Sequence, residues 1–229
     1  MKTIKGVVAA KEPLTDRITE FKISPTPGTS LPEFEPGSHA TFVLPDDRTR
    51  SYSLVTFDGD GSGDYRFAVQ VEEAGDGGSK AMHALGVGHE VTFEPPKNDF
   101  ELVLDRPAVL LAGGIGVTPL ISMATALNAA GTPFRFHFAG RTGSAMVYRE
   151  RLQEALGDAL VLHCDDEPDT ALDLDAVVAE AADKDLYVCG PRGMIEAAKS
   201  KAEAAGMPKE RIHFELFDNV GKTQEGDSA

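Results

Sequence analysis

Short apolar runs, each rich in β-branched and aromatic residues, recur through the N-terminal part of the chain. Pro, Gly, Asp or Asn residues bound each run, which is typical of short strands separated by turns. The predicted strands span residues 3–10, 18–24, 39–44, 51–56, 65–71 and 90–93. Strands of this length predict a small antiparallel barrel of six strands. One short helix, at residues 79–85, is expected to interrupt it, with Ser79 as the N-cap.

The pattern changes at residue 108, where short apolar runs begin to alternate with longer, alanine-rich stretches. The expected strands are 108–112, 134–138, 160–163, 186–189 and 212–214, and the expected helices are 118–130, 144–156, 173–182 and 192–205. Alternating strands and helices predict βαβ units and a doubly wound parallel sheet. We therefore expect a barrel domain at residues 1–101, an α/β domain at 102–217 and a polar tail or linker at 218–229.

Composition and charge narrow the classes of function. The 229 residues carry 22 basic and 37 acidic side chains, a net charge of −15, which disfavours nucleic acids and anionic membranes as partners. No apolar run approaches the roughly 20 residues that span a bilayer, and the N-terminus lacks a signal-peptide pattern, so a cytoplasmic protein is expected. The two cysteines, Cys164 and Cys189, are expected to be reduced and are too few to ligate an iron–sulfur cluster.

A candidate anion site lies on one barrel strand. Arg50 and Tyr52 share one face of this strand, and Ser51 and Ser53 share the other. The guanidinium fork of an arginine matches a phosphate, and a tyrosine ring can stack on a flat ligand. The same residues would also fit an ordinary barrel strand with one surface arginine.

A second candidate phosphate contact lies at the start of the short helix. Gly77 and Gly78 allow close approach of a ligand to the backbone, and Ser79 follows them directly. Two adjacent glycines are also typical of a simple turn. Two separate segments of the barrel therefore each offer a contact to a phosphate group.

A glycine-rich turn follows the first strand of the α/β domain. Gly113, Gly114 and Gly116 are expected to face a pyrophosphate, with Thr118 as the N-cap and Pro119 at the first helical position. Pro119 stands where the third glycine of the G-x-G-x-x-G pattern would be, so the turn is a variant of that pattern. A tight turn in any α/β protein is the alternative explanation.

Two other strand ends carry similar signals. Gly140 and Arg141 follow the second strand, and Cys189, Gly190 and Pro191 end the fourth. In open α/β sheets, ligands bind beyond the carboxyl ends of the strands. Cys189 could therefore lie beside a nicotinamide ring, although a cysteine at such a place can also be a small buried hydrophobe.

An acidic run follows the third strand of this domain. Asp165, Asp166 and Glu167 would repel the 2′-phosphate of NADP and could accept hydrogen bonds from a ribose diol, which favours NADH. Arg141 is the residue that would instead favour NADPH. The alternative for the acidic run is a solvated loop.

Taken in order, these motifs resemble the ferredoxin–NADP reductase superfamily, and within it the reductase components of phthalate dioxygenase reductase and vanillate demethylase reductase type. The likeness covers about residues 3–217. The matching segments are the Arg-x-Tyr-Ser flavin motif at 50–53, the Gly-Gly-Ser motif of the FMN-binding branch at 77–79, the nucleotide motif at 113–119, Cys-Gly-Pro at 189–191 and the closing strand at 213–217.

This resemblance implies an enzyme that binds FMN, with FAD as the alternative, and that oxidises NADH or NADPH. It implies that Arg50 and Ser79 hold the flavin phosphate, Tyr52 stacks on the ring and Ser53 bonds near flavin N5. The residues implied to bind the cofactors are Arg50, Ser51, Tyr52, Ser53, Ala68, Val69, Gln70, Gly77, Gly78, Ser79, Gly113, Gly114, Gly116, Thr118, Pro119, Gly140, Arg141, Asp165, Asp166, Cys189, Gly190, Pro191 and Phe217. Those implied to lie at the reacting atoms are Ser53, Cys189, Glu215 and Phe217. Neither His39 nor His83 is given a catalytic role.

The sequence departs from this family in one respect. Reductases of this type usually carry a C-terminal, plant-type 2Fe–2S ferredoxin domain, whose cysteine motif the sequence up to Ala229 does not contain. The expected acceptor is therefore such a domain on a longer chain, or a separate ferredoxin, with a Rieske-type oxygenase beyond it. The alternatives are reduction of a diffusible acceptor such as free flavin or a ferric chelate, and a non-catalytic module that binds flavin or nucleotide.

Overall fold

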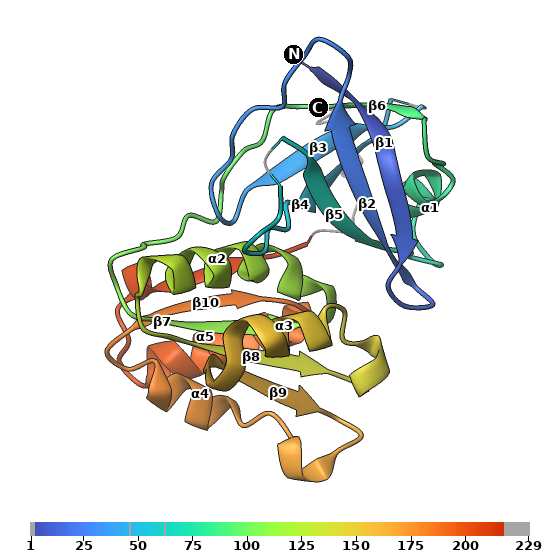
Figure 1. Cartoon of the computed structure of the whole chain (residues 1–229). Coiled ribbons are helices and arrows are strands. Elements are labelled where there is room, and N and C mark those ends of the chain that lie inside the picture. Colours follow the sequence, from blue (N-terminus) through green and yellow to red (C-terminus); the bar gives the residue numbers. More distant parts are fainter. Residues whose placement is uncertain (1–2, 46, 62, 218–229) are drawn as a thin grey trace, which may run out of the picture.

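The computed structural model describes residues 3–45, 47–61 and 63–217, so the predicted tail at 218–229 lies outside the described residues. The N-terminal strands form one antiparallel sheet in the order β4-β3-β6-β1-β2-β5 (Figure 1). They are β1 (Ile4–Pro13), β2 (Ile18–Pro25), β3 (His39–Val43), β4 (Thr49–Ser53), β5 (Tyr65–Gln70) and β6 (Glu90–Phe93). The sheet closes where the Val55 N–H, just beyond β4, donates to the Arg66 carbonyl of β5 over 2.9 Å. The predicted six-stranded barrel is therefore confirmed.

Aromatic rings fill the barrel because alternate residues of its strands point inward. The Phe42 ring centroid lies 5.0 Å from that of Phe67 and 5.3 Å from that of Phe93. All three side chains are fully buried or nearly so. The short helix α1 (Gly78–His83) covers one end of this core through Met82.

The C-terminal strands form a parallel sheet in the order β11-β10-β7-β8-β9, as predicted for a doubly wound domain. They are β7 (Ala108–Gly113), β8 (Phe134–Gly140), β9 (Leu160–Cys164), β10 (Asp185–Cys189) and β11 (Ile212–Glu215). The strand order reverses between β7 and β10, so a crevice opens beyond their carboxyl ends, where such sheets bind ligands. Every residue of the central strand β7 is buried, as expected for a strand covered on both faces.

Helices cover both faces of this sheet (Figure 1). On one face are α2 (Val117–Ala130) and α3 (Arg149–Leu156), and on the other are α4 (Leu174–Glu180) and α5 (Arg192–Ala204). The helix α2 lies between the sheet and the barrel, and one apolar cluster joins barrel residues such as Val55 and Phe57 to Leu120 and Ile121 of α2. Within the described residues, no helix is long and apolar enough to cross a membrane.

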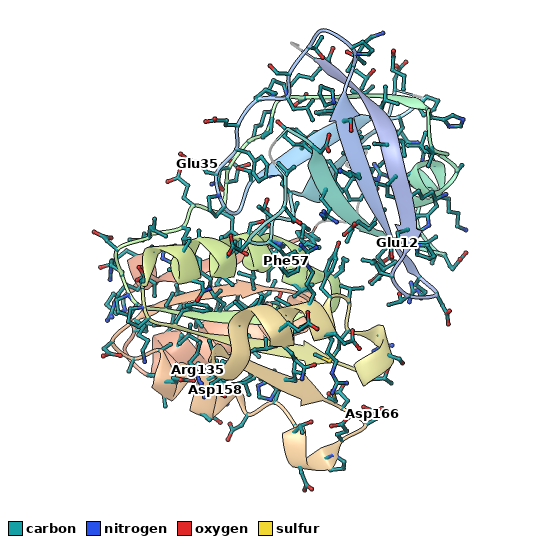
Figure 2. The ribbon with its side chains drawn as sticks, in the orientation of Figure 1. Glu12, Glu35, Phe57, Arg135, Asp158 and Asp166 are labelled. Carbon is teal, nitrogen blue, oxygen red and sulfur yellow. The ribbon has the colours of Figure 1, made fainter. Side chains whose placement is uncertain are left out.

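Polar contacts fix the orientation of the two domains. The Tyr148 hydroxyl, at the start of α3, donates to the Glu20 carboxylate of β2 over 2.5 Å. Arg151 of α3 donates to Asp60 over 2.5 Å, and its guanidinium lies 3.9 Å from the Phe57 ring centroid. Figure 2 shows Phe57 at this boundary between the barrel and the α/β domain. A packed and hydrogen-bonded interface therefore holds the two domains in a defined arrangement.

Two elements differ from their sequence predictions. The strand expected at 51–56 ends at Ser53, because the following backbone turns toward α2 and the Thr56 N–H donates to the Ser122 hydroxyl over 3.0 Å. The helix expected to start at residue 144 starts at Arg149, because a 3₁₀ turn spans Gly143–Ala145 and Tyr148 adopts a left-handed conformation at φ 61°. In both places, contacts distant in the sequence override the local pattern.

The predicted helix caps were also wrong. Gly77, at φ 93°, is the N-cap of α1, and the Ser79 hydroxyl instead accepts a hydrogen bond from the Glu72 N–H at 2.9 Å. Gly116 is the N-cap of α2, because the glycine turn winds into the helix earlier than expected. Thr118 is thus the second helical residue and its hydroxyl donates to the Ile115 carbonyl over 3.0 Å, while Pro119 is the third.

Candidate active site

A cavity of about 1150 Å³ lies beside β3 and β4 and reaches the α/β domain. Side chains from both domains line it, and they come from segments far apart in the sequence. The lining residues are His39, Asp47, Arg48, Thr49, Arg50, Ser51, Tyr52, Ser53, Ala68, Gln70, Glu72, Gly75, Asp76, Ser79, Asp99, Ile115, Thr118, Phe214, Glu215, Leu216 and Phe217. Four of the five predicted motifs, all except Cys-Gly-Pro at 189–191, therefore contribute residues to one space.

The barrel wall of this cavity is built by the antiparallel pairing of β3 and β4. In this register His39 lies opposite Ser53, and Ala40 lies opposite Tyr52. Ala40 is fully buried, and the neighbouring Phe42 ring lies 5.9 Å from the Tyr52 ring at an interplanar angle of 62°. One side of the Tyr52 ring is therefore supported by the barrel core.

Four buried polar atoms around this cavity have no hydrogen-bond partner among the described residues. They are His39 Nδ1, the Tyr52 hydroxyl, Ser53 Oγ and Glu215 Oε2. Buried polar atoms in native proteins are almost always paired with protein, water or ligand. All four residues line the same cavity, so it offers donors and acceptors to a polar ligand.

Burial changes the ionisation of these groups. Burial raises the pKa of Tyr52 to about 12, so its hydroxyl is protonated at neutral pH and can donate. Burial, and then the nearby Asp99 carboxylate, raise the pKa of Glu215 to about 7. Burial lowers the pKa of His39, which favours the neutral imidazole. At neutral pH the Tyr52 hydroxyl is therefore uncharged and the Glu215 carboxyl group is near the midpoint of its titration.

One end of the cavity, its basic end, is lined by Arg48 and Arg50 together with Asp76. Arg48 donates to the main-chain carbonyl of Asp76, in the turn before α1, and Arg50 donates to the Asp76 carboxylate. Gly78 N–H donates to the same carboxylate over 3.2 Å, and an added Cβ at Gly78 would lie 2.9 Å from Arg50 Nη2. The glycine at this position thus lets the arginine lie directly against the backbone.

The α/β domain contributes a tightly packed turn. An added Cβ at Gly116 would lie 2.5 Å from the carbonyl carbon of Cys189 and 2.6 Å from Gly190 N. An added Cβ at Gly190 would lie 2.9 Å from Gly113 N. The turns after β7 and β10 therefore touch through bare backbone, which is why the sequence requires glycine there.

Cys189 itself does not reach the cavity. Its side chain is fully buried beneath the turn, and burial, and then Glu215, raise the pKa of its thiol well above the usual range. Thr118 and Ile115 form the part of the cavity wall that comes from this turn. The remaining predicted residues Gly114, Pro119 and Pro191 surround the turn but are absent from the cavity wall.

The predicted ribose-binding residues lie at the next two strand ends. Gly140 ends β8, Arg141 follows it, and Asp165 N–H donates to the Gly140 carbonyl over 3.0 Å. Arg141, Asp165 and Asp166 are all exposed. Figure 2 shows Asp166 in the loop beyond β9, on the side of the domain away from the barrel. These residues are outside the cavity and on the same edge of the sheet as the glycine turn.

Sequence reasoning therefore identified much of the cavity wall. Val69 is the exception on β5, because its side chain is in the barrel core and it does not line the cavity. His83 also serves the barrel, since its Nε2 lies 2.9 Å from the Val69 carbonyl oxygen. Two residues of the cavity wall were not predicted: Arg48, just before β4, and Asp76, which no local pattern connects to the arginines.

The comparisons with known proteins agree with this geometry. Residues 110–200 match the oxidoreductase NAD-binding domain family. The chain is 40% identical to tetrachlorobenzoquinone reductase of Sphingobium chlorophenolicum, over 87% of this chain and 63% of that protein. It is 34% identical to vanillate O-demethylase oxidoreductase of Pseudomonas putida, over 99% of this chain and 72% of that protein. It thus spans less than two thirds of the first of these relatives, and 35% of oxidoreductase NdmD of Pseudomonas putida.

A solved structure shows the same arrangement of domains. The crystal structure of phthalate dioxygenase reductase, described as a modular structure for electron transfer from pyridine nucleotides to 2Fe–2S, superimposes with a TM-score of 0.85 and 28% identity. The match covers 93% of this chain and 68% of that one. The barrel followed by the parallel sheet is therefore a shared architecture.

Proposed function

The chain belongs to the ferredoxin–NADP reductase superfamily, in the family that includes the vanillate O-demethylase oxidoreductases, and on this basis we propose that it is an NADH-dependent flavin oxidoreductase. One observation carries the proposal: four unpaired polar atoms and a pair of arginines surround a single cavity at the junction with the nucleotide domain. We propose the division into a flavin domain at 1–101 and a nucleotide domain at 102–217, in a protein that works in the cytoplasm.

The residues of the barrel wall fit a flavin. The basic end with Arg48 and Arg50 suits a phosphate, because arginine forks bind phosphate oxygens in pairs. Tyr52 offers a ring and Ser53 an unpaired hydroxyl to a flat, polar-edged ring system. A flavin bound there would accept a hydride from nicotinamide and pass electrons on one at a time.

The residues of the α/β domain fit the nicotinamide nucleotide. Thr118 and Ile115 bring the glycine turn to the cavity wall, so a nicotinamide bound at the turn would approach the flavin space from this side. Phe217 also lines the cavity and is 38% exposed, so it can shift without disrupting a core. The work of the protein is to hold the two rings together and to exclude water, since proximity supplies much of the rate in such transfers.

Within this proposal FMN is favoured over FAD, and NADH over NADPH. The Gly-Gly-Ser motif at 77–79 lies beside the two arginines, which suits a terminal phosphate. Asp165 and Asp166 are exposed at the end of β9, where they would repel a 2′-phosphate. Arg141 follows β8 on the same edge of the sheet and is the residue that would support NADPH.

The proposed electron acceptor is an iron–sulfur protein, either a 2Fe–2S ferredoxin domain or a separate ferredoxin that serves a Rieske-type oxygenase. The support comes from relatives that are reductase components, such as the carnitine monooxygenase reductase subunit of Escherichia coli, which is 32% identical over 94% of this chain. Phe214 and Phe217, each 38% exposed, border the cavity and would offer an apolar surface near the flavin.

The proposal is tested by the visible absorption spectrum of the purified protein, reconstituted with FMN and held without oxygen. One equivalent of NADH should bleach the flavin bands, and NADPH should do so much more slowly. Flavin bands that persist with both nucleotides would leave only a binding function. A protein that binds neither FMN nor FAD would refute the flavin assignment.

A diffusible acceptor is the second candidate, because the relative from Sphingobium chlorophenolicum is named for reduction of a quinone. The two candidates differ in their response to ionic strength. The rate of transfer to a separate ferredoxin should depend on salt, because salt screens the charges of the two proteins, whereas reduction of a neutral quinone should change little. Steady-state rates with both acceptors between low and high salt distinguish them.

A further inference from the structure

Two arginines converge on one aspartate at the basic end of the cavity, and Arg48 donates to the main-chain carbonyl of Asp76. Arg50 Nη2 donates to Asp76 Oδ2, and Arg48 Nη1 lies 3.5 Å from Asp76 Oδ1. The Gly78 N–H donates to the same Oδ1 atom over 3.2 Å. Asp76 thereby accepts hydrogen bonds or ion pairs from two segments. One contains Arg48 and Arg50, in and just before β4, and the other is the turn before α1.

These are the donors that a phosphate group would use. Carboxylate and phosphate oxygens both accept from guanidinium forks and from backbone N–H groups. A hydrogen atom that Arg50 or Gly78 directs at Asp76 is not available to a ligand in the same place. The hydrogen bond from Arg50 lowers the pKa of Asp76, so the competing group is a charged carboxylate at neutral pH.

The position of Asp76 allows it to leave. Its side chain is 45% exposed, so it can turn toward water and be solvated there. Gly75 and Gly77 flank it, and Gly77 has a positive φ of 93°, so the turn carries little side-chain packing that would hold Asp76 in place. Arg50, by contrast, is anchored on β4, where Phe42 of β3 lies opposite it in the register.

From this geometry we infer that Asp76 is an internal competitor of the flavin phosphate. Its carboxylate holds the Arg50 guanidinium when no phosphate is bound, and it must give up this contact for a phosphate to bind there. Asp76 thus weakens binding of phosphorylated flavins and leaves binding of the ring unaffected. This inference rests on the proposed function, because it assumes a flavin in the cavity.

The test is a pair of titrations on the full chain after removal of bound flavin. Asp76→Asn keeps the size of the side chain and removes its charge. The variant should bind FMN roughly five- to tenfold more tightly than the parent, since one screened charge next to the arginines is gone. It should bind riboflavin, which has no phosphate, with unchanged affinity. Quenching of flavin fluorescence gives both dissociation constants.

Glu73→Gln is the matched control. Glu73 lies in the same turn and pairs with Lys80 over 3.0 Å, but its side chain is outside the cavity wall. This variant makes the same change in net charge, so its FMN affinity should stay within about twofold of the parent. A tenfold gain in Glu73→Gln as well would overturn the inference, because it would show a general effect of charge.

Two other outcomes would also overturn it. Weaker FMN binding by Asp76→Asn would mean that Asp76 orients Arg50 for the phosphate. Unchanged FMN binding would mean that Asp76 leaves the site at no cost. Failure of the parent protein to bind either FMN or riboflavin would instead refute the proposed flavin site itself, so the two failures are distinguishable. A thermal melt of each variant confirms that it is folded.

Discussion

The two halves of the proposed site are built in opposite ways. The barrel half is open, and Tyr52 and Ser53 present buried polar atoms that have no partner among the described residues. The α/β half is closed, since the turns at Gly116 and Gly190 lie against each other through bare backbone and Cys189 is fully buried beneath them. One half has the form of a preformed polar cavity, and the other has the form of a packed core.

This difference matches what each half is proposed to bind. A flavin that stays bound through many turnovers suits a preformed site with polar atoms that are free to hydrogen-bond a ligand. A nicotinamide that enters and leaves in each turnover suits a site that opens transiently, with Phe217 as the exposed residue that can move. The changes below affect first the closed half, then Glu215 in the cavity that both halves share, and then the open half.

The largest effect is expected for Gly116→Ala in the closed half. The added methyl group would lie 2.5 Å from the Cys189 carbonyl carbon and 2.6 Å from Gly190 N, and backbone atoms cannot give way as a side chain can. We expect a loss of about 3 kcal/mol in stability and loss of NADH binding. Gly193→Ala is the control, because an added Cβ there meets nothing within 4 Å. A Gly116→Ala protein with unchanged melting temperature and NADH affinity would show that the turns are not closely packed.

The next effect concerns Glu215, which belongs to the α/β half but faces the shared cavity. Its folded pKa of about 7 is above its ordinary value of 4.5, so folding favours the protonated form. The stability that this provides is fully present below about pH 4.5 and is lost as pH rises through about 7. The full span corresponds to roughly 3 kcal/mol.

Glu215→Gln isolates this contribution from the other titrating groups. As the pH rises from 5 to 8, the unfolding free energy of the parent should fall relative to that of the variant. Denaturant unfolding across this range measures it. A difference that stays constant with pH would mean that the Glu215 carboxyl group is well solvated.

A somewhat smaller effect is expected for Arg50→Ala in the open half. Loss of the guanidinium should weaken FMN binding roughly 10- to 100-fold, because a charge-assisted contact to phosphate is removed. NADH binding should change little, since Arg50 lies in the barrel wall. Arg50→Lys should recover part of the affinity, because lysine supplies the charge without the fork. Unchanged flavin retention in Arg50→Ala would remove the phosphate assignment and with it the contrast between the halves.

The sequence predicted the fold well because the two periodicities are local. Residues 65–71 alternate as a strand must, and the spacing of strands and helices after residue 108 leaves few options other than a parallel sheet. The predictions of element ends were wrong where contacts between residues distant in the sequence determine the backbone conformation. The strand β4 ends at Ser53 because Ser122 of α2 binds the backbone that follows, and no pattern near residue 53 encodes that contact.

The site was predictable to the extent that its residues are neighbours in sequence. Arg50, Tyr52 and Ser53 were found together, and Arg48 could have been, since it is only two residues from Arg50 in the sequence. Asp76 could not, because only the closed barrel brings the turn before α1 beside β4. The contribution of His39 depends likewise on the pairing of β3 with β4, which no local pattern specifies.

The smallest expected effect is that of Cys189→Ala, and it sharpens the comparison most. If the closed half opens for nicotinamide, Cys189 at the end of β10 becomes a neighbour of the ring, and its loss should slow hydride transfer several-fold while flavin stays bound. Cys164→Ala is the matched control, because Cys164 is also a buried cysteine at a strand end, where its sulfur lies 3.5 Å from the sulfur of Met146. Both variants should lose about 1 kcal/mol of stability from the small cavity left behind.

Only Cys189→Ala should change the rate of flavin reduction in anaerobic stopped-flow mixing with NADH. Equal rates in the two variants would mean that Cys189 is simply part of the core and that the closed half binds nicotinamide without exposing it.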